Sequence, residues 1–295
     1  FTVPEELNSI IYSNQKLLYD ALYHAASATL NELSKDAKYL GADIGYICIL
    51  HTWGSAMNYH PHIHTIVLGG GLDDENKWKE TGGNFFLPYG VISKVFRGKY
   101  LDELKSLWND SKLKFHGTAE KYQNSYRFKE LLDKCYEKNW VTYCKETFNG
   151  AQSVINYLGK YTHRIAISNH RIKSMTDTTV TYVVKDYKNE GCWKEKTISG
   201  EEFIRRFMMH VPPKRFVRIR HYGLLSCRNK RKKITHCRNL LGCKKYISTL
   251  KNLNAVEMIK VLYNIDVYKC SSCGGNMVSP RKDKYSSSFR AHMRC

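Results

Sequence analysis

The residues from His60 to Leu68 read His-Pro-His-Ile-His-Thr-Ile-Val-Leu, with histidine and apolar positions alternating in the first half. Period-two alternation predicts a β-strand that presents His62 and His64 on one face, where both imidazoles can bind one metal ion. Two ligands leave the ion open to a further protein ligand and to substrate oxygens, which suits polarisation of a phosphodiester. We expect His51 on the preceding strand to be the third ligand. The alternatives for this position are His60 and Gln152.

Two tyrosines four positions apart, Tyr157 and Tyr161, form the second constellation. On a helix, residues with this spacing lie one above the other. A phenolate next to a metal-held phosphate is a nucleophile that can cut a nucleic-acid backbone, and the resulting phosphotyrosine keeps the energy of the broken bond. The cations Lys160, Arg164 and Arg171 follow closely in the sequence, and positive charges lower the pKa of a phenol and bind phosphate. We therefore expect these three residues to contact DNA.

The charge of the chain points to a polyanionic partner. Its 47 Lys and Arg residues against 27 Asp and Glu residues give a net charge of +20, and a field of that sign concentrates nucleic acid. We find no apolar run long enough for a membrane span and no signal peptide, and we expect no membrane partner. Most of the ten cysteines stand singly, which is typical of a reduced cytosolic protein.

A basic stretch from Lys214 to Lys233 is interleaved with aromatic residues such as Phe216 and Tyr222. Cations neutralise phosphates and aromatic faces stack on unpaired bases, so this combination favours single-stranded DNA. The predicted DNA-binding residues of the stretch are Arg218, Arg220, Arg228, Lys230, Arg231, Lys232 and Lys233.

The segment Cys270-Ser271-Ser272-Cys273-Gly274-Gly275 has the outline of a zinc knuckle. Cys270 and Cys273 would bind a structural zinc ion with no catalytic part, and the site needs two more ligands. The candidates for these are His292 with Cys295, Cys237 with Cys243, or Cys227.

The remaining patterns predict the elements that position these groups. Apolar periodicity predicts helices within 5–40, 91–108, 120–135 and 151–161, the last of which carries the tyrosines. Strands are predicted at 43–53, as the hairpin partner of the histidine strand, and at 179–187 and 193–198, as a second hairpin. A short extended piece is expected at 165–170. Ser199 and Glu202 form a candidate capping box for a helix through Met209.

At this point the chain resembles the two-tyrosine HUH transposases of bacterial rolling-circle insertion sequences, the insertion-sequence ninety-one type. The blocks that carry the resemblance are His51-Thr52-Trp53-Gly54, His60-Pro61-His62-Ile63-His64 with Gly69-Gly70-Gly71-Leu72, Val95-Phe96-Arg97-Gly98-Lys99, Tyr157-Leu158-Gly159-Lys160-Tyr161-Thr162-His163-Arg164-Ile165-Ala166-Ile167-Ser168-Asn169, and Phe203-Ile204-Arg205-Arg206-Phe207 followed by Phe216-Val217-Arg218-Ile219-Arg220-His221-Tyr222-Gly223. The blocks occur in family order across nearly the whole chain.

The resemblance implies an α+β protein with the HUH endonuclease fold, a ferredoxin-like antiparallel sheet with flanking helices. We expect a catalytic domain at 1–210, and a basic DNA-binding arm with a small cysteine-containing zinc-knuckle unit at 211–295. His62 and His64 would hold Mg²⁺ or Mn²⁺, and Tyr157 and Tyr161 would be the nucleophiles. Family members also carry an N-terminal cysteine-rich zinc module, which is absent before Phe1 in this sequence, so we expect upstream sequence.

The implied reaction is the nicking of one DNA strand at an element end, which gives a 5′-phosphotyrosine and a free 3′-OH for rolling-circle transposition. The expected partners are single-stranded element ends and the host replication machinery, in the bacterial cytoplasm at the nucleoid. The oligomeric state is left open. The alternatives are a plasmid or phage replication initiator or relaxase, and a non-catalytic basic DNA-binding remnant of a mobile element.

Overall fold

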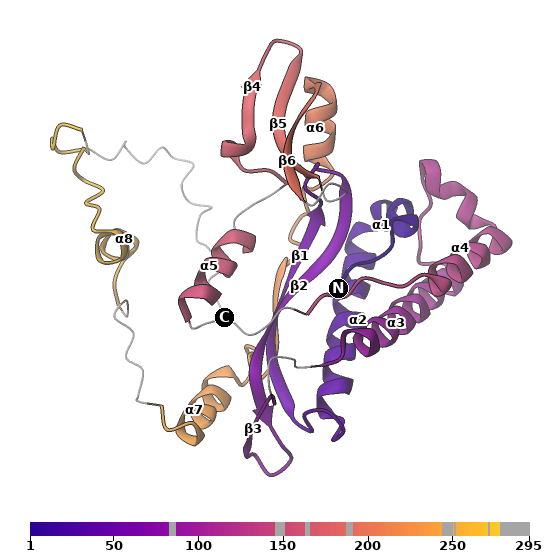
Figure 1. Ribbon diagram of the computed structural model, residues 1–295, viewed down its shortest axis with the longest axis horizontal. Helices are drawn as coiled ribbons and strands as arrows, with labels where there is room; N and C mark the ends of the chain where they lie inside the picture. Colours follow the sequence, from indigo (N-terminus) through magenta and orange to yellow (C-terminus); the bar gives the residue numbers. More distant parts are fainter. Residues whose placement is uncertain are drawn as a thin grey trace. The chain divides into compact units, whose positions relative to one another are not determined.

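The computed structural model of the chain describes residues 1–82, 87–144, 151–162, 166–186, 191–243, 250, 252–270 and 272–277, and side chains 153–159 within the helix at 151–162. Its contacts divide the chain into two compact units, Phe1–Cys237 and Arg238–Cys295. The larger unit combines antiparallel sheets with flanking helices (Figure 1), which confirms the predicted α+β class. The division after Cys237 differs from the boundary at residue 210 that the sequence suggested.

A four-stranded antiparallel sheet forms the centre of the larger unit, in the order β3-β2-β1-β7. The two long central strands are β1 (Asp43–Trp53) and β2 (Tyr59–Leu72), which pair as the expected hairpin. The flanking strands β3 (Trp78–Glu80) and β7 (Ile219–Gly223) were not predicted. Because β7 pairs with β1 from Gly45 to Ile49, the first part of the predicted basic arm is a strand of this sheet.

Helices cover one face of the sheet. They are the 3₁₀ turn η1 (Glu5–Leu7), α1 (Asn8–Ser13), α2 (Gln15–Lys35), α3 (Tyr89–Asn109), η2 (Gly117–Gln123) and α4 (Ser125–Glu137). Buried residues of α2 recur every three or four positions, as at Leu18, Leu22 and Ala25. They pack with Cys48 and Leu50 of β1 into the main core. The odd-numbered positions of β1, which include His51, therefore point to the opposite face.

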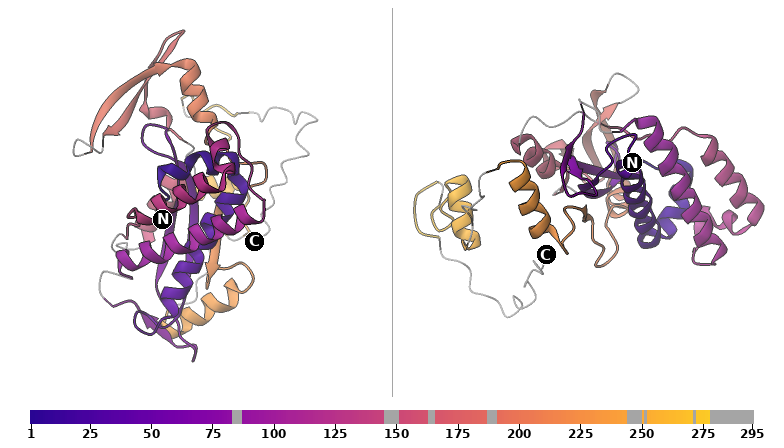
Figure 2. Two further views of the ribbon diagram at one scale, coloured as in Figure 1. Left: turned by 90° about the vertical axis from the view of Figure 1, so that its right-hand side faces the viewer. Right: turned by 90° about the horizontal axis from the view of Figure 1, so that it is seen from below.

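The helix α5 (Ala151–Thr162) lies on that opposite side of the sheet from α2 and α3 (Figures 1 and 2). This is the predicted tyrosine helix. Among its described side chains, residues 153–159, none is buried. The side chains of residues 153–159 are thus not among the buried residues of the main core.

A smaller three-stranded sheet, β4 (Ile172–Met175), β5 (Thr179–Asp186) and β6 (Cys192–Ser199), carries α6 (Gly200–Met208) on one face. The β5–β6 hairpin was predicted, and part of its turn lies outside the described residues. The expected extended piece at 165–170 is wrong at Ala166, which has a positive φ of 55°, and from Asn169, where a 3₁₀ turn, η3 (Asn169–Arg171), begins before β4, whereas Ser168 between them has extended backbone. We call the described residues 166–186 and 191–210, which contain η3, β4–β6 and α6, the clamp module.

One of the two hydrogen bonds of the predicted capping box of α6 is present. The hydroxyl of Ser199 accepts a hydrogen bond from the backbone N–H of Glu202 at 3.2 Å. The carboxylate of Glu202 forms ion pairs with Arg205 and Arg206 at 2.6 Å instead of completing the box. Glu202 consequently fixes two arginines of its own helix, and the second of these reaches β1–β2.

The helix α7 (Lys230–Leu240) was not predicted, since its sequence lacks an apolar stripe. In the smaller unit, α8 (Ala255–Tyr263) begins with a capping box between Asn254 and Glu257. A bridge between Lys269 and Asn276 closes a short hairpin that contains Cys270 and Cys273. Within the described ranges, no helix has the length and hydrophobicity needed to cross a membrane.

Candidate active site

Three imidazoles meet on the sheet face opposite α2 and α3. His51 is directly opposite His62 in the β1–β2 ladder, and His64 is opposite Ile49, so all three share that face. Each offers a ring nitrogen, and these atoms lie within 4.8 Å of one another. His60 is not part of this group, and the Gln152 side chain lies outside the described residues. Of the three sequence candidates for the third position, His51 is the one that the geometry supports.

A β-bulge next to the site orients His62. Between the pairs His51–His62 and Trp53–Tyr59, β2 contains one residue more than β1. Pro61 lies in this irregular part and has no N–H for the ladder. The carbonyl of His60 accepts a hydrogen bond from Nδ1 of His62 at 2.7 Å. With its proton on Nδ1, the imidazole of His62 turns the lone pair of Nε2 toward His64.

Burial keeps the two ligand candidates of β2 neutral. Burial, followed by the effect of the neighbouring His51, lowers the pKa of His64 from 6.5 to about 3. Burial, followed by the effect of His64, lowers the pKa of His62 well below its ordinary value. Neutral imidazole is the form that binds metal, so these side chains need not lose a proton at neutral pH.

The donor set fits a divalent metal ion. Nε2 of His62 and Nε2 of His64 are 3.1 Å apart, which is the separation of two ligands that meet an ion at right angles with bonds of about 2.1–2.2 Å. The group consists of nitrogen donors, without a carboxylate. Imidazole donors favour Mn²⁺ and other transition metals over Mg²⁺, which prefers oxygen. Three ligands on one side would leave positions for substrate oxygens.

Tyr157 is the tyrosine that the structure brings to the histidines. Its hydroxyl lies 2.9 Å from Nδ1 of His64, and the two rings meet edge to face at 6.2 Å. Tyr161 follows one turn later on α5, but its side chain and that of Lys160 lie outside the described residues, as does Arg164. Of the two predicted nucleophiles, Tyr157 is the one whose side chain is described, and it contacts His64.

Two of the predicted DNA-binding arginines are engaged within the protein. Nε of Arg171 donates to the carbonyl of Val183 at 2.8 Å, and Nη2 donates to the carbonyl of Ser55. Arg220 forms an ion pair with Asp20, and its guanidinium lies 4.0 Å from the ring centroid of Tyr23. These contacts give both arginines a structural role, and their DNA contacts remain a prediction.

Arg218 lies nearer to the site. Its carbonyl accepts a hydrogen bond from the backbone N–H of Leu50 at 3.0 Å, which places it beside β1. Its guanidinium is 5.9 Å from the ring centroid of Trp53. Burial lowers the pKa of this arginine, although it remains charged at neutral pH. A cation is thus available next to the histidine face.

The other basic residues project from α7 and the turn before it. Arg228, Lys230, Arg231 and Lys232 are exposed, and Lys233 is half-buried. Nε2 of His236 lies 2.9 Å from the carbonyl oxygen of Asn76, and Cys237 is buried with Leu72 and Leu224. The helix is therefore anchored to the end of the β1–β2 hairpin that is remote from its tip, and its Lys230 and Lys232 are exposed to solvent.

The cysteine hairpin of the smaller unit has the backbone of a knuckle. The N–H of Cys270 donates to the carbonyl of Gly275 at 2.8 Å, and the N–H of Gly274, with a φ of +70°, donates to the carbonyl of Cys270. Hydrogen bonds from the backbone N–H groups of Cys273 and Ser272 lower the pKa of the Cys270 thiol. Of the suggested partners, Cys237 is used in the core, and His292 and Cys295 lie outside the described residues.

Sequence reasoning missed two residues that contact His51 or its neighbours. Trp53 stacks on His51 with ring centroids 4.5 Å apart and an interplanar angle of 16°. His210, which is 3% exposed, lies with Nδ1 3.2 Å from the hydroxyl of Thr52. Trp53 is adjacent to the histidine in sequence and could have been suspected from the His-Thr-Trp-Gly block. His210 is an isolated histidine 158 positions from Thr52, and no local pattern indicates it.

An antiparallel sheet with imidazoles on its two central strands and a helix-borne tyrosine above them is the arrangement of an HUH-type protein. Residues 45–233 match the family Y2_Tnp, described as "Putative transposase". The chain belongs to this transposase family, as its sequence blocks had suggested.

Two curated relatives agree with this assignment. The chain is 40% identical over 243 residues, 82% of its length, to "Putative transposase y4qJ" of Sinorhizobium fredii. It is 29% identical over 280 residues, 94% of its length, to the transposase for insertion sequence element IS801 of Pseudomonas savastanoi pv. phaseolicola. The matches span 61% and 65% of these relatives. No solved structure matches the chain.

Proposed function

We propose that this protein nicks single-stranded DNA at the ends of an insertion sequence, with Tyr157 as the nucleophile, to start rolling-circle transposition. The observation that carries the proposal is the 2.9 Å contact between the Tyr157 hydroxyl and His64, a member of the histidine group. Membership of the transposase family supports this reading over a replication initiator or a relaxase, which use the same chemistry.

The chemistry follows from the two partners of this contact. His51, His62 and His64 would hold a divalent ion, which supplies a positive charge on the non-bridging oxygens of the scissile phosphate. The Tyr157 oxygen attacks phosphorus and the bond from phosphorus to the 3′ oxygen breaks. The phenol loses its proton and the departing 3′ oxygen gains one, so the products are a 5′-phosphotyrosine and a free 3′-OH.

Tyr161 provides for a second exchange. Its backbone is one helical turn from Tyr157 on α5, so the two tyrosines could react one after the other at the same ion. The free 3′-OH would prime synthesis by the host replication machinery, and the displaced strand would be transferred as single-stranded DNA. In this proposal the protein acts on nucleoid DNA in the cytoplasm of a bacterium, the kind of organism from which both relatives come.

The proposal is tested by covalent capture on DNA. Single-stranded oligonucleotides that tile both flanks of the coding sequence are incubated with the chain and Mn²⁺, with a label at the 3′ or the 5′ end. We expect the 3′-labelled fragment to migrate with the protein in a denaturing gel and the 5′-labelled fragment to be extendable by a polymerase. The adduct should fall by roughly 10³-fold or more in Tyr157→Phe. Tyr161→Phe should retain the first adduct and lose the second transfer.

A substitution in the histidine group separates cleavage from DNA binding. His64→Ala should abolish the adduct while DNA affinity, which comes mainly from phosphate neutralisation, stays within about twofold. A wild-type yield of adduct in Tyr157→Phe would refute the role of this tyrosine. Binding without any adduct for the unchanged chain would instead support the non-catalytic DNA-binding alternative.

A further inference from the structure

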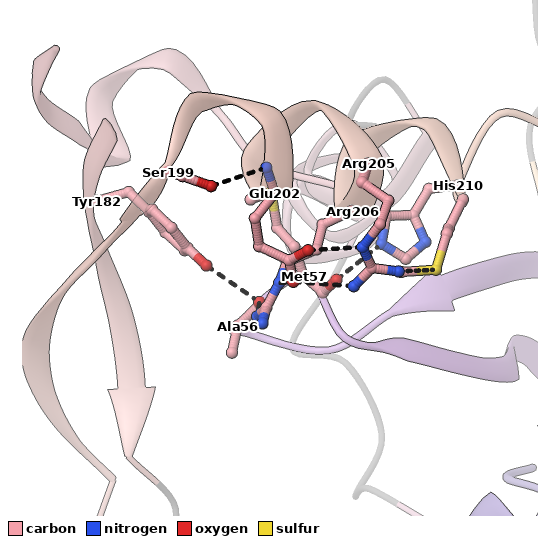
Figure 3. A network of polar contacts seen from close by, with 9 residues as sticks. Ala56, Met57, Tyr182, Ser199, Glu202, Arg205, Arg206 and His210 are labelled. Atoms are coloured by element: carbon pink, nitrogen blue, oxygen red, sulfur yellow. Dashed lines mark hydrogen bonds and ion pairs between the residues drawn. The ribbon is translucent and has the colours of Figure 1, made fainter. Parts of the chain in front are cut away.

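The tip of the β1–β2 hairpin, residues 54–58, is held by the clamp module (Figure 3). Three consecutive backbone carbonyls of this tip accept hydrogen bonds from side chains of the module. The donors are Arg171 to Ser55, Tyr182 at 3.2 Å and Arg206 at 3.1 Å to Ala56, and His210 at 3.2 Å to Met57. The hairpin that carries the histidine group is therefore fixed at its tip by a separate part of the fold.

Met57 completes this attachment. Its side chain is fully buried among Ala166, Tyr182 and Val184. Its φ is +55°, a left-handed backbone conformation that few residues other than glycine, asparagine and aspartate adopt readily. The tip thus has one defined conformation, set by contacts with the clamp module.

His210 has a special place among these contacts because it touches β1 as well as the tip. Only a donor can bind the Met57 carbonyl, so Nε2 of His210 carries the proton. Nδ1 of the neutral ring is then an acceptor, and it takes the hydrogen bond of the Thr52 hydroxyl at 3.2 Å. Burial lowers the pKa of His210, although hydrogen bonds to the backbone of Met57 and of Thr52 act in the opposite direction. One side chain thereby ties Thr52 to Met57 across the tip.

Thr52 is the residue between His51 and Trp53. Trp53 stacks on His51, and the ring centroid of His210 is 6.0 Å from that of Trp53. The β1–β2 register shifts between His51 and Trp53, so regular ladder pairing does not fix the backbone at this point. Contacts from outside the hairpin, among them those of His210, therefore act on the backbone next to His51.

We propose that His210 is a positioning residue of the metal centre, which fixes Thr52 and Trp53 so that His51 completes the ligand group of His62 and His64. This inference rests on the metal centre of the proposed function. It assigns to the clamp module a role in metal binding, although none of its described residues belongs to the ligand group.

The test measures metal binding in the absence of DNA. Mn²⁺ is titrated into the full chain, and free Mn²⁺ is followed by electron paramagnetic resonance. Loss of outer contacts to a ligand typically weakens metal binding 10- to 100-fold, and we expect about this loss for His210→Ala and for Thr52→Val, which removes only the hydroxyl. His210→Gln keeps a donor and an acceptor in similar places and should restore most of the affinity.

Arg205→Ala is the matched control on α6, the helix that ends just before His210, because the described contacts of the Arg205 guanidinium go to Glu202 and Met209. It should bind Mn²⁺ as the unchanged chain does. If His210→Ala does not fold, Thr52→Val decides the question. Wild-type affinity in a folded His210→Ala or in Thr52→Val overturns the inference, as does a His210→Gln variant as weak as His210→Ala. An unchanged chain that binds no Mn²⁺ would refute the metal centre itself and the proposed function with it.

Discussion

The Tyr157 hydroxyl lies 2.9 Å from Nδ1 of His64, across 93 positions of sequence. His64 has two ring nitrogens, and the other one, Nε2, is directed at His62. One imidazole therefore connects the nucleophile candidate with the ligand group.

The nitrogen-only ligand group should discriminate between metals. We expect Mn²⁺ to bind at least about tenfold more tightly than Mg²⁺, because imidazole is a better ligand for the transition metal and no carboxylate belongs to the group. Competition of Mg²⁺ against Mn²⁺, followed by electron paramagnetic resonance, measures the ratio. Equal affinities would mean that oxygen ligands complete the site and that the three imidazoles are not its main donors.

The metal-free chain should lose stability in mild acid. The pKa of His64 is about 3 in the folded chain and near 6.5 when unfolded, so the unfolded state takes up the proton first as the pH falls. The contribution of His64 to the free energy of unfolding is therefore complete above about pH 6.5 and is lost as the pH falls toward 3. Between pH 7.5 and pH 5 the His64 contribution is at most about 2 kcal/mol. Urea unfolding of chelator-treated chain measures it, and His64→Gln should show a smaller loss by that amount.

The basic face of α7 should appear in the salt dependence of DNA binding. Each phosphate contact on single strands contributes about 0.7 to the slope of log affinity against log salt. Neutralising Lys230–Lys233 should lower that slope by roughly 2–3, as measured by fluorescence anisotropy at several salt concentrations. A control that neutralises the exposed Lys94, Lys105 and Lys129 on α3 and α4 should change it little. Equal effects of both sets would argue for diffuse attraction and against a defined α7 contact.

The cysteine hairpin should hold zinc. We expect chain purified without chelator to lose about one equivalent of zinc when Cys270 and Cys273 are both changed to serine, because thiolates supplied with backbone N–H donors are good zinc ligands. Elemental analysis gives the metal content. Cys192→Ser, which changes an exposed cysteine of β6, is the control and should keep the zinc. An unchanged zinc content in the double variant would leave the hairpin as a structure without metal.

The central hairpin and its histidines could be predicted from sequence because the determinants are local. Period-two alternation placed His62 and His64 on one face, and adjacency of the two strands made His51 the first candidate for the third position. The i to i+4 spacing placed the tyrosines on a helix. That Tyr157 contacts His64 depends on packing between distant segments, which the spacing of the tyrosines does not reveal.

The parts that escaped prediction lack a local signal. The strand β7 reads Ile-Arg-His-Tyr-Gly and is a strand only because β1 offers it an edge. The helix α7 has a polar sequence and is anchored by His236 and Cys237. His210 meets Thr52 across 158 positions, so only the folded chain reveals that the two residues act together.

The β1–β2 hairpin is attached at both ends, by the clamp module at its tip and by α7 at the other, whereas α5 contributes no buried side chain among residues 153–159. The hairpin that carries the histidine group is therefore fixed at both of its ends. If Tyr157 forms the proposed covalent link to DNA, the attached strand has to leave the histidines before a second exchange. We expect α5 to make that movement, with the hairpin staying in place.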